Sequence, residues 1–285
     1  MSITWCVIDR RSSADYGPGM TTTFGNKLRD WRTSRHLSQL DLAATAGVSQ
    51  RHISFLETGR ARPSREMVIH LAATLDVPLR QRNDLLDSAG FAPAYRERDP
   101  DDEQLTQVRG VLTQLLNAHE PFPAYIVDRL WNLVAANAIA TKLIALALPP
   151  GADTAQIQGN VLRLMLHPAG VRDAIVNWEA VAGVLVRRLS REVAERPGDT
   201  DLAELLSDAL GFADTAGINL AESAPRADEL LVPIVLATPL GNLETFTTIA
   251  TIGAAHDVTL EELRIETLLP ATPEAEELLR ELAEG

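Results

Sequence analysis

Cysteine is almost absent from this sequence. Among 285 residues only Cys6 is a cysteine, so no disulfide can form within the chain. A chain that cannot form an internal disulfide is typical of a reducing compartment. The first residues also lack the apolar core of a secretory signal peptide. We therefore expect a cytoplasmic protein.

Long apolar runs are also missing. The longest candidate, residues 138–148, contains Lys142 and is followed by two prolines, and it is shorter than the roughly 18 apolar residues that cross a bilayer. We therefore expect no membrane as a partner. With 46% hydrophobic and 23% charged residues, the composition is that of an ordinary globular protein, and the length is typical of about two domains.

Motifs for catalysis and metal binding are lacking as well. The sequence contains no nucleophile-elbow pattern, no phosphate-binding loop and no dinucleotide-binding glycine pattern. No two of the six histidines lie close enough in the sequence to form a pair of metal ligands. His256 and Asp257 are adjacent, which is more typical of a turn than of a proton relay. We expect no enzymatic activity, no metal and no resident cofactor.

Acidic residues dominate only the second part of the chain. Taken over the whole chain, the net charge of −13 is unfavourable for a nucleic-acid partner. However, residues 21–98 hold 12 basic and 8 acidic residues, whereas residues 99–285 hold 12 basic and 29 acidic residues. This change of sign predicts a nucleic-acid-binding module joined to a second, acidic module.

Periodicity and turn-forming residues divide the chain into four segments. Residues 1–20 are predicted to be a flexible N-terminal tail, and residues 21–95 a domain of short helices. Residues 96–120 are predicted to be a linker and a connecting helix. Residues 121–285 form the second predicted domain.

A helix-turn-helix pattern lies within residues 37–64. Ser38 is suited to cap a first helix, and Gly47 to end it in a left-handed turn that costs glycine little. Ser49 is suited to cap a second helix. A helix with long polar side chains at its N-terminal end fits the major groove of DNA. The buried face of this second helix is expected to carry Ile53 and Leu56. Its exposed face is expected to carry Gln50, Arg51, Ser54 and Phe55.

Residues 24–92 resemble the Xre/Cro-C1 family of bacterial and phage helix-turn-helix domains. The family pattern L-S-Q-x-x-L-A-x-x-A-G-V-S-x-x-x-I-S-x-x-E-x-G-x-x-x-P-S is matched from Leu37 to Ser64. The resemblance implies an all-α domain of five helices and an internal ion pair between Arg32 and Glu57. It also implies a bacterial, nucleoid-associated protein that binds double-stranded DNA.

The same resemblance assigns roles on DNA. Gln50 and Arg51 would read bases, since glutamine pairs with adenine and arginine with guanine. Arginines that follow the motif would meet phosphates, which position the protein without specifying sequence. Because one module makes few contacts, we expect a homodimer on a two-fold operator. The predicted DNA-binding residues are Gln39, Ser49, Gln50, Arg51, His52, Ser54, Phe55, Arg60, Arg62 and Arg65.

The second domain combines strands and helices. Segments 124–128, 130–135, 231–237, 243–252 and 264–269 have strand-like composition. Helical patterns occupy 137–148, 159–166, 170–195 and 200–213, between the second and third of these segments. About five strands that cluster, instead of alternating with helices, predict an antiparallel α+β domain with a helical layer.

Residues 121–285 resemble the MmyB-like ligand-binding domain of bacterial regulators. The shared features, in chain order, are Trp131 with Asn137, Gly159-Asn160, His167-Pro168, Asn177-Trp178-Glu179 and Arg196-Pro-Gly-Asp199. The resemblance implies a PAS-like fold. The sequence departs from common members at Val232-Pro233-Ile234, where they often have His-Pro before a glycine, and this departure affects the transfer of ligand contacts.

A PAS-like domain holds a small molecule between its sheet and its helices. The expected lining here is apolar, so we expect a fatty-acid-like or other small apolar ligand. The candidate residues are Trp131, Leu133, Asn137, Leu162, Leu166, Trp178, Val235 and Phe246.

Two alternatives stay open at this stage. The apolar candidates can be ordinary core residues, and Asn137 can be a helix cap. The second domain can also be a ligand-free protein-interaction module, as in an antitoxin or a scaffold. The favoured interpretation is a sequence-specific transcription regulator that senses a small molecule.

Overall fold

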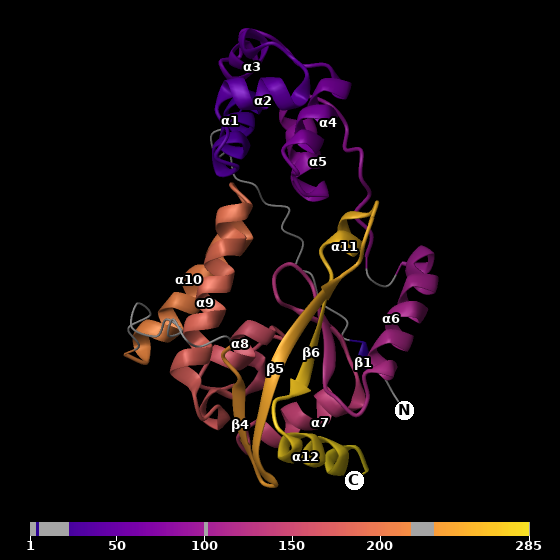
Figure 1. Cartoon of the computed structure of the whole chain (residues 1–285), viewed down its shortest axis with the longest axis vertical. Helices are drawn as coiled ribbons and strands as arrows, with labels where there is room; N and C mark the ends of the chain where they lie inside the picture. Colours follow the sequence, from indigo (N-terminus) through magenta and orange to yellow (C-terminus); the bar gives the residue numbers. More distant parts are fainter. Residues whose placement is uncertain (1–3, 6–22, 100–101, 218–230, 285) are drawn as a thin grey trace.

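The computed structural model describes residues 4–5, 23–99, 102–217 and 231–284. Figure 1 shows a group of short helices at one end of the molecule and a curved sheet with surrounding helices at the other. An all-α domain followed by an α+β domain is therefore confirmed. The boundaries placed between the domains stay a prediction.

The N-terminal part consists of five helices. Ser38, Ser49 and Ser64 each accept a hydrogen bond from a backbone N–H of the helix that follows. Gly47 ends α2 with a φ of 66°, in the left-handed region. The predicted helix-turn-helix is therefore confirmed, including its caps. The helices are α1 Phe24–Ser34, α2 Gln39–Ala46, α3 Gln50–Glu57, α4 Arg65–Thr74 and α5 Leu79–Ser88.

One aliphatic core holds these helices together. Burial of a large side chain of this kind contributes roughly 1.5–3 kcal/mol. Gly25 lets α1 pass close to the end of α3, because a Cβ at this position would lie 2.6 Å from the carbonyl oxygen of Glu57. The fully buried members include Leu28, Leu42, Ile53, Leu56, Leu71, Leu75, Leu85 and Leu86.

A single antiparallel sheet organises the second part. Its strands lie in the order β1-β3-β2-β6-β5-β4. The five predicted strands are present, and β4 lies at an edge, as Pro233 predicts. The bounds are β1 Thr4–Trp5, β2 Ala124–Val127, β3 Leu133–Ala136, β4 Ile234–Thr238, β5 Gly241–Thr251 and β6 Arg264–Pro270.

Two expectations for this sheet need correction. A flexible tail over residues 1–20 does not describe Thr4 and Trp5, which form β1 and pair with Ala136 and Ala135; the other residues of the tail lie outside the described part. The predicted strand 130–135 begins only at Leu133. The carboxylate of Asp128 accepts hydrogen bonds from two backbone N–H groups after it and so folds residues 129–132 into a turn.

Helices cover the sheet in three clusters. α6 packs on β2, β3 and β6, whereas α7 and α12 pack together with β4 and β5. α8, α9 and α10 share a third core. A continuous helix over 170–195 is wrong, because Ile175 bridges to Leu236 of β4 and α9 begins only at Trp178. The bounds are α6 Thr106–Ala118, α7 Ala138–Ala147, α8 Val161–Leu166, α9 Trp178–Glu195, α10 Thr200–Thr215, α11 Val258–Glu261 and α12 Pro273–Glu284, with short 3₁₀ turns at Glu103–Leu105, Thr154–Gln156 and Arg172–Ala174.

The short helix α11 connects the two parts. The backbone N–H of Leu79, at the start of α5, donates to the Glu261 carboxylate at 2.7 Å. The adjacent Arg80 donates to Glu262 at 2.7 Å and to Glu97 at 2.6 Å. We refer to Leu79, Arg80, Glu97, Glu261 and Glu262 as the α5–α11 junction. None of the helices in the described ranges is long and apolar enough to span a membrane.

Candidate DNA-reading surface and ligand pocket

The recognition helix α3 has one buried and one exposed face. Ile53 and Leu56 are buried in the core of the N-terminal part. Gln50 and Arg51 are exposed at its N-terminal end, directly after the cap Ser49. Figure 1 places α3 at the end of the molecule, away from the sheet. Of the other candidates, Ser49, Arg60 and Arg62 are exposed, whereas Gln39, His52, Ser54, Phe55 and Arg65 are half-buried.

Phe55 contacts two of these arginines. The guanidinium of Arg51 lies 5.0 Å from the centre of the Phe55 ring, and that of Arg60 lies 5.9 Å from it. A cation at such a distance is attracted to the face of an aromatic ring. Phe55 therefore orients one candidate base-reading side chain and one candidate phosphate-binding side chain, a role that the sequence did not reveal.

Glu57 organises the base of this surface from inside the domain. Its buried carboxylate accepts hydrogen bonds from Arg32 at 2.6 Å and from the amide of Gln39 at 2.8 Å. Burial alone raises the pKa of Glu57, but these bonds and the charges of Arg32 and Arg29 hold the pKa below its ordinary value of 4.5. The ion pair that the resemblance implies is confirmed. Gln39 is thus held by Glu57, and its contact with DNA stays a prediction.

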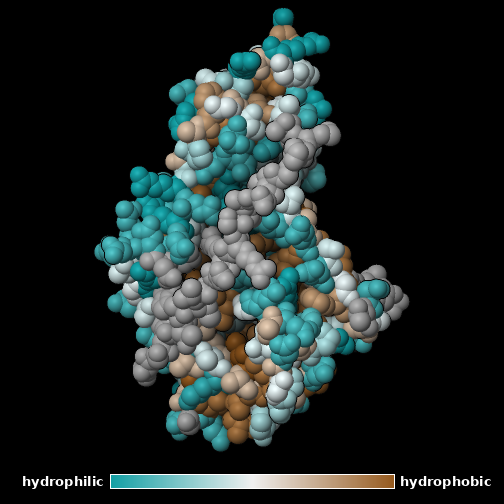
Figure 2. Space-filling view, turned by 180° about the vertical axis from the view of Figure 1, so that it is seen from behind, coloured by the Kyte–Doolittle hydropathy of each residue, from teal (hydrophilic) through white to brown (hydrophobic). Residues whose placement is uncertain are grey.

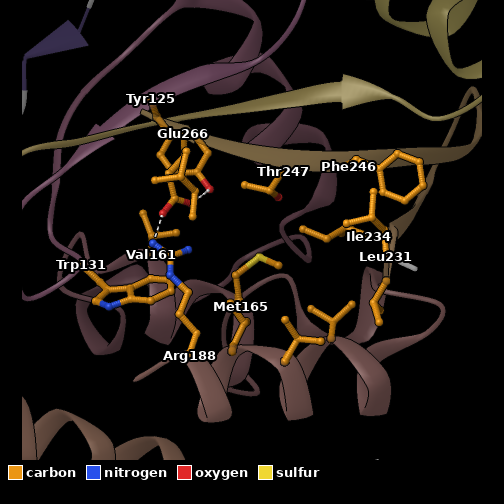
Figure 3. Close-up of a pocket in the computed structure, with 15 residues that line it drawn as sticks. Tyr125, Trp131, Val161, Met165, Arg188, Leu231, Ile234, Phe246, Thr247 and Glu266 are labelled. Atoms are coloured by element: carbon orange, nitrogen blue, oxygen red, sulfur yellow. Dashed lines mark hydrogen bonds and ion pairs between the residues drawn. The ribbon is translucent and has the colours of Figure 1, made fainter. Parts of the chain in front are cut away.

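A pocket lies beside the sheet in the second part. It has a volume of about 220 Å³ and lies between α8, α9 and the strands β2, β5 and β6. Figure 3 shows Phe246, Ile234 and Leu231 at one end and Tyr125, Glu266 and Arg188 at the other. Met165 lies between the two ends. The pocket is therefore apolar along most of its length and polar at one end.

The polar end is built from four elements. Glu266 of β6 is 2% exposed and accepts hydrogen bonds from Arg188 of α9 at 2.7 Å and from the Tyr125 hydroxyl of β2 at 3.0 Å. Burial and the charge of Glu266 raise the pKa of Tyr125 well above its ordinary value, so this hydroxyl stays protonated and donates. Trp131 closes the end in the turn before β3, with a φ of 65°.

Trp131 is held between charged groups. The guanidinium groups of Arg188 and Arg264 lie 4.2 Å and 4.9 Å from the centre of its ring. Its indole N–H donates to Glu192 at 3.1 Å. A desolvated cation–π contact contributes on the order of 2 kcal/mol. Contacts from α9 and β6 therefore hold Trp131 in a left-handed backbone conformation, which is uncommon for residues other than glycine.

Comparison with known protein families gives two matches. Residues 108–282 match the MmyB-like transcription regulator ligand binding domain. The chain belongs to this family. Residues 28–81 match a helix-turn-helix domain, whereas a search of curated proteins found no match. The two matches together make this MmyB-like chain a DNA-binding regulator, and both families are regulatory rather than enzymatic. In the described ranges no group of histidine, cysteine, aspartate and glutamate side chains is arranged to hold a metal ion.

The eight candidate ligand residues of this MmyB-like domain lie in different places. Trp131 and Phe246 line the pocket. Leu162 and Leu166 lie in the core shared by α8, α9 and α10. Trp178 packs beside them and donates its indole N–H to the carbonyl of Met165 at 3.0 Å. Ligand contact by any of these residues stays a prediction.

Like Leu162, Leu166 and Trp178, the other three candidates lie outside the pocket lining. Asn137 is fully buried and caps α7 by accepting the N–H of Ala140 at 2.9 Å. Leu133 is half-buried at the start of β3. Val235 does not line the pocket, whereas its neighbour Ile234 does. Adjacent residues of a strand face opposite sides of the sheet.

Sequence reasoning missed the polar residues of the pocket. Arg188 interrupts the apolar stripe of α9, and Glu266 is an acidic residue within a strand, between Ile265 and Thr267. A charged residue on a buried face needs a partner. These two charged residues were the available signal, but only the fold shows that they pair with each other.

Proposed function

We propose that this chain is a transcription regulator that reads an operator with α3 and binds a small apolar molecule in its MmyB-like domain. The observation that carries the proposal is the apolar pocket with one buried polar end, in the same chain as an exposed Gln50-Arg51 recognition helix. A ligand site of this kind is mostly apolar with a few polar groups that fix orientation.

We also propose that two copies act together on DNA. One short recognition helix offers few base contacts, and helix-turn-helix proteins usually bind two half-sites related by a two-fold axis. The acidic remainder of the chain disfavours contact with phosphate. It therefore supports a complex in which only the N-terminal part faces the duplex.

Ligand binding would reach the DNA-binding part through β6. Glu266 lines the pocket, and four residues earlier Glu262 pairs with Arg80 at the α5–α11 junction. A ligand changes DNA affinity only if it binds more tightly to one of two arrangements of the chain. The short stretch of chain from Glu262, at the end of α11, to Glu266 in β6 gives the ligand a physical route to such a difference.

The test of the ligand proposal uses native mass spectrometry on the purified full chain. We expect a lipid-sized adduct that is lost in Leu185→Trp, because the larger side chain fills the pocket. Leu240→Trp is the matched control, since Leu240 is exposed in the turn between β4 and β5. An adduct that survives Leu185→Trp, or no apolar molecule bound under any condition, contradicts the proposal.

A second function is favoured by one surface observation. On α6, Val111 is 60% and Leu115 is 37% exposed. Figure 2 also shows apolar side chains among polar ones in the lower part of the molecule. Such surfaces often mark protein contacts. If the MmyB-like domain instead binds a partner protein, Val111→Glu abolishes that association while Leu185→Trp leaves it unchanged.

A further inference from the structure

The polar end of the pocket is electrically balanced before any ligand arrives. Arg188 donates from Nη2 to Glu266 at 2.7 Å and from Nε to Glu192 at 3.2 Å. Arg264 donates to the same carboxylate of Glu192. Two guanidinium groups therefore face two carboxylates, and each cation already has an anionic partner.

A second carboxylate would meet unfavourable surroundings here. Glu266 is almost fully buried, so its charge is poorly screened by water. Arg188 is the only basic residue among the described residues that line the pocket. A ligand carboxylate would have to compete with Glu266 for Arg188 and would leave one of the two anions buried without a cation.

Hydrogen-bonding capacity remains for an uncharged group. Within the described ranges Arg188 donates from Nε and Nη2 only, so the N–H groups of Nη1 are left to donate. Each oxygen of Glu266 accepts one bond and has a lone pair for a second. A hydroxyl group both donates and accepts, so one hydroxyl can satisfy Glu266 and Arg188 together.

We propose that the pocket binds an apolar molecule whose polar end is an uncharged hydroxyl group, and that it discriminates against the free carboxylate of a fatty acid of the same length. The apolar chain lies along Met165 and Leu185 toward Phe246, and the hydroxyl meets Glu266 and Arg188. This inference rests on the proposed function, because it names the head-group chemistry of that ligand.

The experiment compares two probes of equal chain length, decanol and decanoate. Their affinities for the delipidated full chain are measured by isothermal titration calorimetry at neutral pH. We expect decanol to bind at least about tenfold more tightly than decanoate, a difference of roughly 1.4 kcal/mol. Glu266→Gln keeps the shape and removes the negative charge, so it should strengthen decanoate binding about tenfold. It should weaken decanol binding, because the hydroxyl loses a charged acceptor, so the preference for decanol should be lost.

The outcomes separate the inference from the proposed function. Tighter binding of decanoate than of decanol to the unmodified chain overturns the head-group inference and leaves the apolar pocket standing. Binding of neither probe, or binding that Leu185→Trp does not weaken, overturns the pocket assignment and the head-group inference with it. The comparison on the unmodified chain decides the question even if Glu266→Gln does not fold.

Discussion

At the residue scale, two arginines of the DNA-reading surface should have different roles. Arg51 lies on the exposed face of α3 and Arg62 follows the helix-turn-helix, and both side chains are exposed. We expect Arg51→Ala to lose roughly 1–3 kcal/mol of preference at one base position. Arg62→Ala should weaken binding to all sequences alike, because phosphate contacts carry no sequence information. Competition binding over a set of single-base operator variants measures both effects.

Arg280→Ala is the control for this pair. Arg280 is exposed and bonds to Glu276 on α12, far along the chain from the DNA-reading surface. The Arg280→Ala substitution removes one positive charge without changing any candidate DNA contact. Equal, sequence-independent losses from Arg51→Ala and Arg62→Ala would contradict the assignment of Arg51 to base reading.

Glu57 is a residue whose charge should stabilise the N-terminal part. Glu57→Gln leaves the buried Arg32 without its anion, and removal of one partner of a buried pair costs on the order of 3–5 kcal/mol. Because the pKa of Glu57 is lowered on folding, its contribution is fully present above the unfolded value of 4.5 and is lost as the pH falls through the lower, folded value. Urea unfolding followed by circular dichroism should show the difference between the two proteins shrinking below pH 4.5. A difference that does not change with pH would show that the charge of Glu57 contributes nothing.

At the element scale, the α5–α11 junction should carry the coupling between pocket and DNA. Glu262→Gln weakens the ion pair with Arg80, because it removes the charge of the mostly buried Glu262 carboxylate. We expect DNA affinity in this variant to become independent of the pocket ligand, while ligand affinity itself stays within about twofold, because Glu262 does not line the pocket. Fluorescence anisotropy of labelled operator, with and without ligand, measures the coupling.

Glu276→Gln is the matched control for the junction, since Glu276 pairs with Arg280 on the exposed side of α12. It removes the same charge and should leave the coupling intact. A ligand response that persists unchanged in Glu262→Gln would exclude this junction as the route.

Elements defined by local signals could be predicted, whereas those defined by distant contacts could not. Ser38, Gly47 and Ser49 determine the limits of α2 and α3 through bonds to neighbouring backbone groups, and such signals can be read from the sequence. The turn around Trp131 depends on the Asp128 side chain and on arginines from α9 and β6. The pairing of Arg188 with Glu266 joins residues 78 positions apart. The family resemblance gave the fold and two pocket residues, but the polar end required the three-dimensional arrangement.

At the scale of the whole molecule, charge and shape agree on how DNA is approached. Residues 21–98 carry a net +4 and residues 99–285 a net −17. Figure 1 places α3 at the opposite end of the molecule from β4, β5 and α12. A duplex that contacts α3 is therefore kept apart from most of the acidic surface, which would otherwise repel it. The net negative charge of the chain is compatible with DNA binding because its basic and acidic parts occupy different ends of the molecule.

This geometry leads to a prediction about half-site spacing. If two copies bind through a two-fold axis, their recognition helices enter successive major grooves about one helical turn, or ~10 base pairs, apart. Insertion of about five base pairs between half-sites rotates one half-site to the opposite face of the duplex, and we expect affinity to fall to that of a single half-site. Insertion of about ten base pairs restores the rotation, so part of the loss should be recovered if the dimer can reach. Gel-shift titration with sites of graded spacing, together with mass photometry of the complexes, measures affinity and copy number. One copy per site with no dependence on spacing would contradict the two-fold arrangement, because a single α3 contacts one groove and does not respond to a distant half-site.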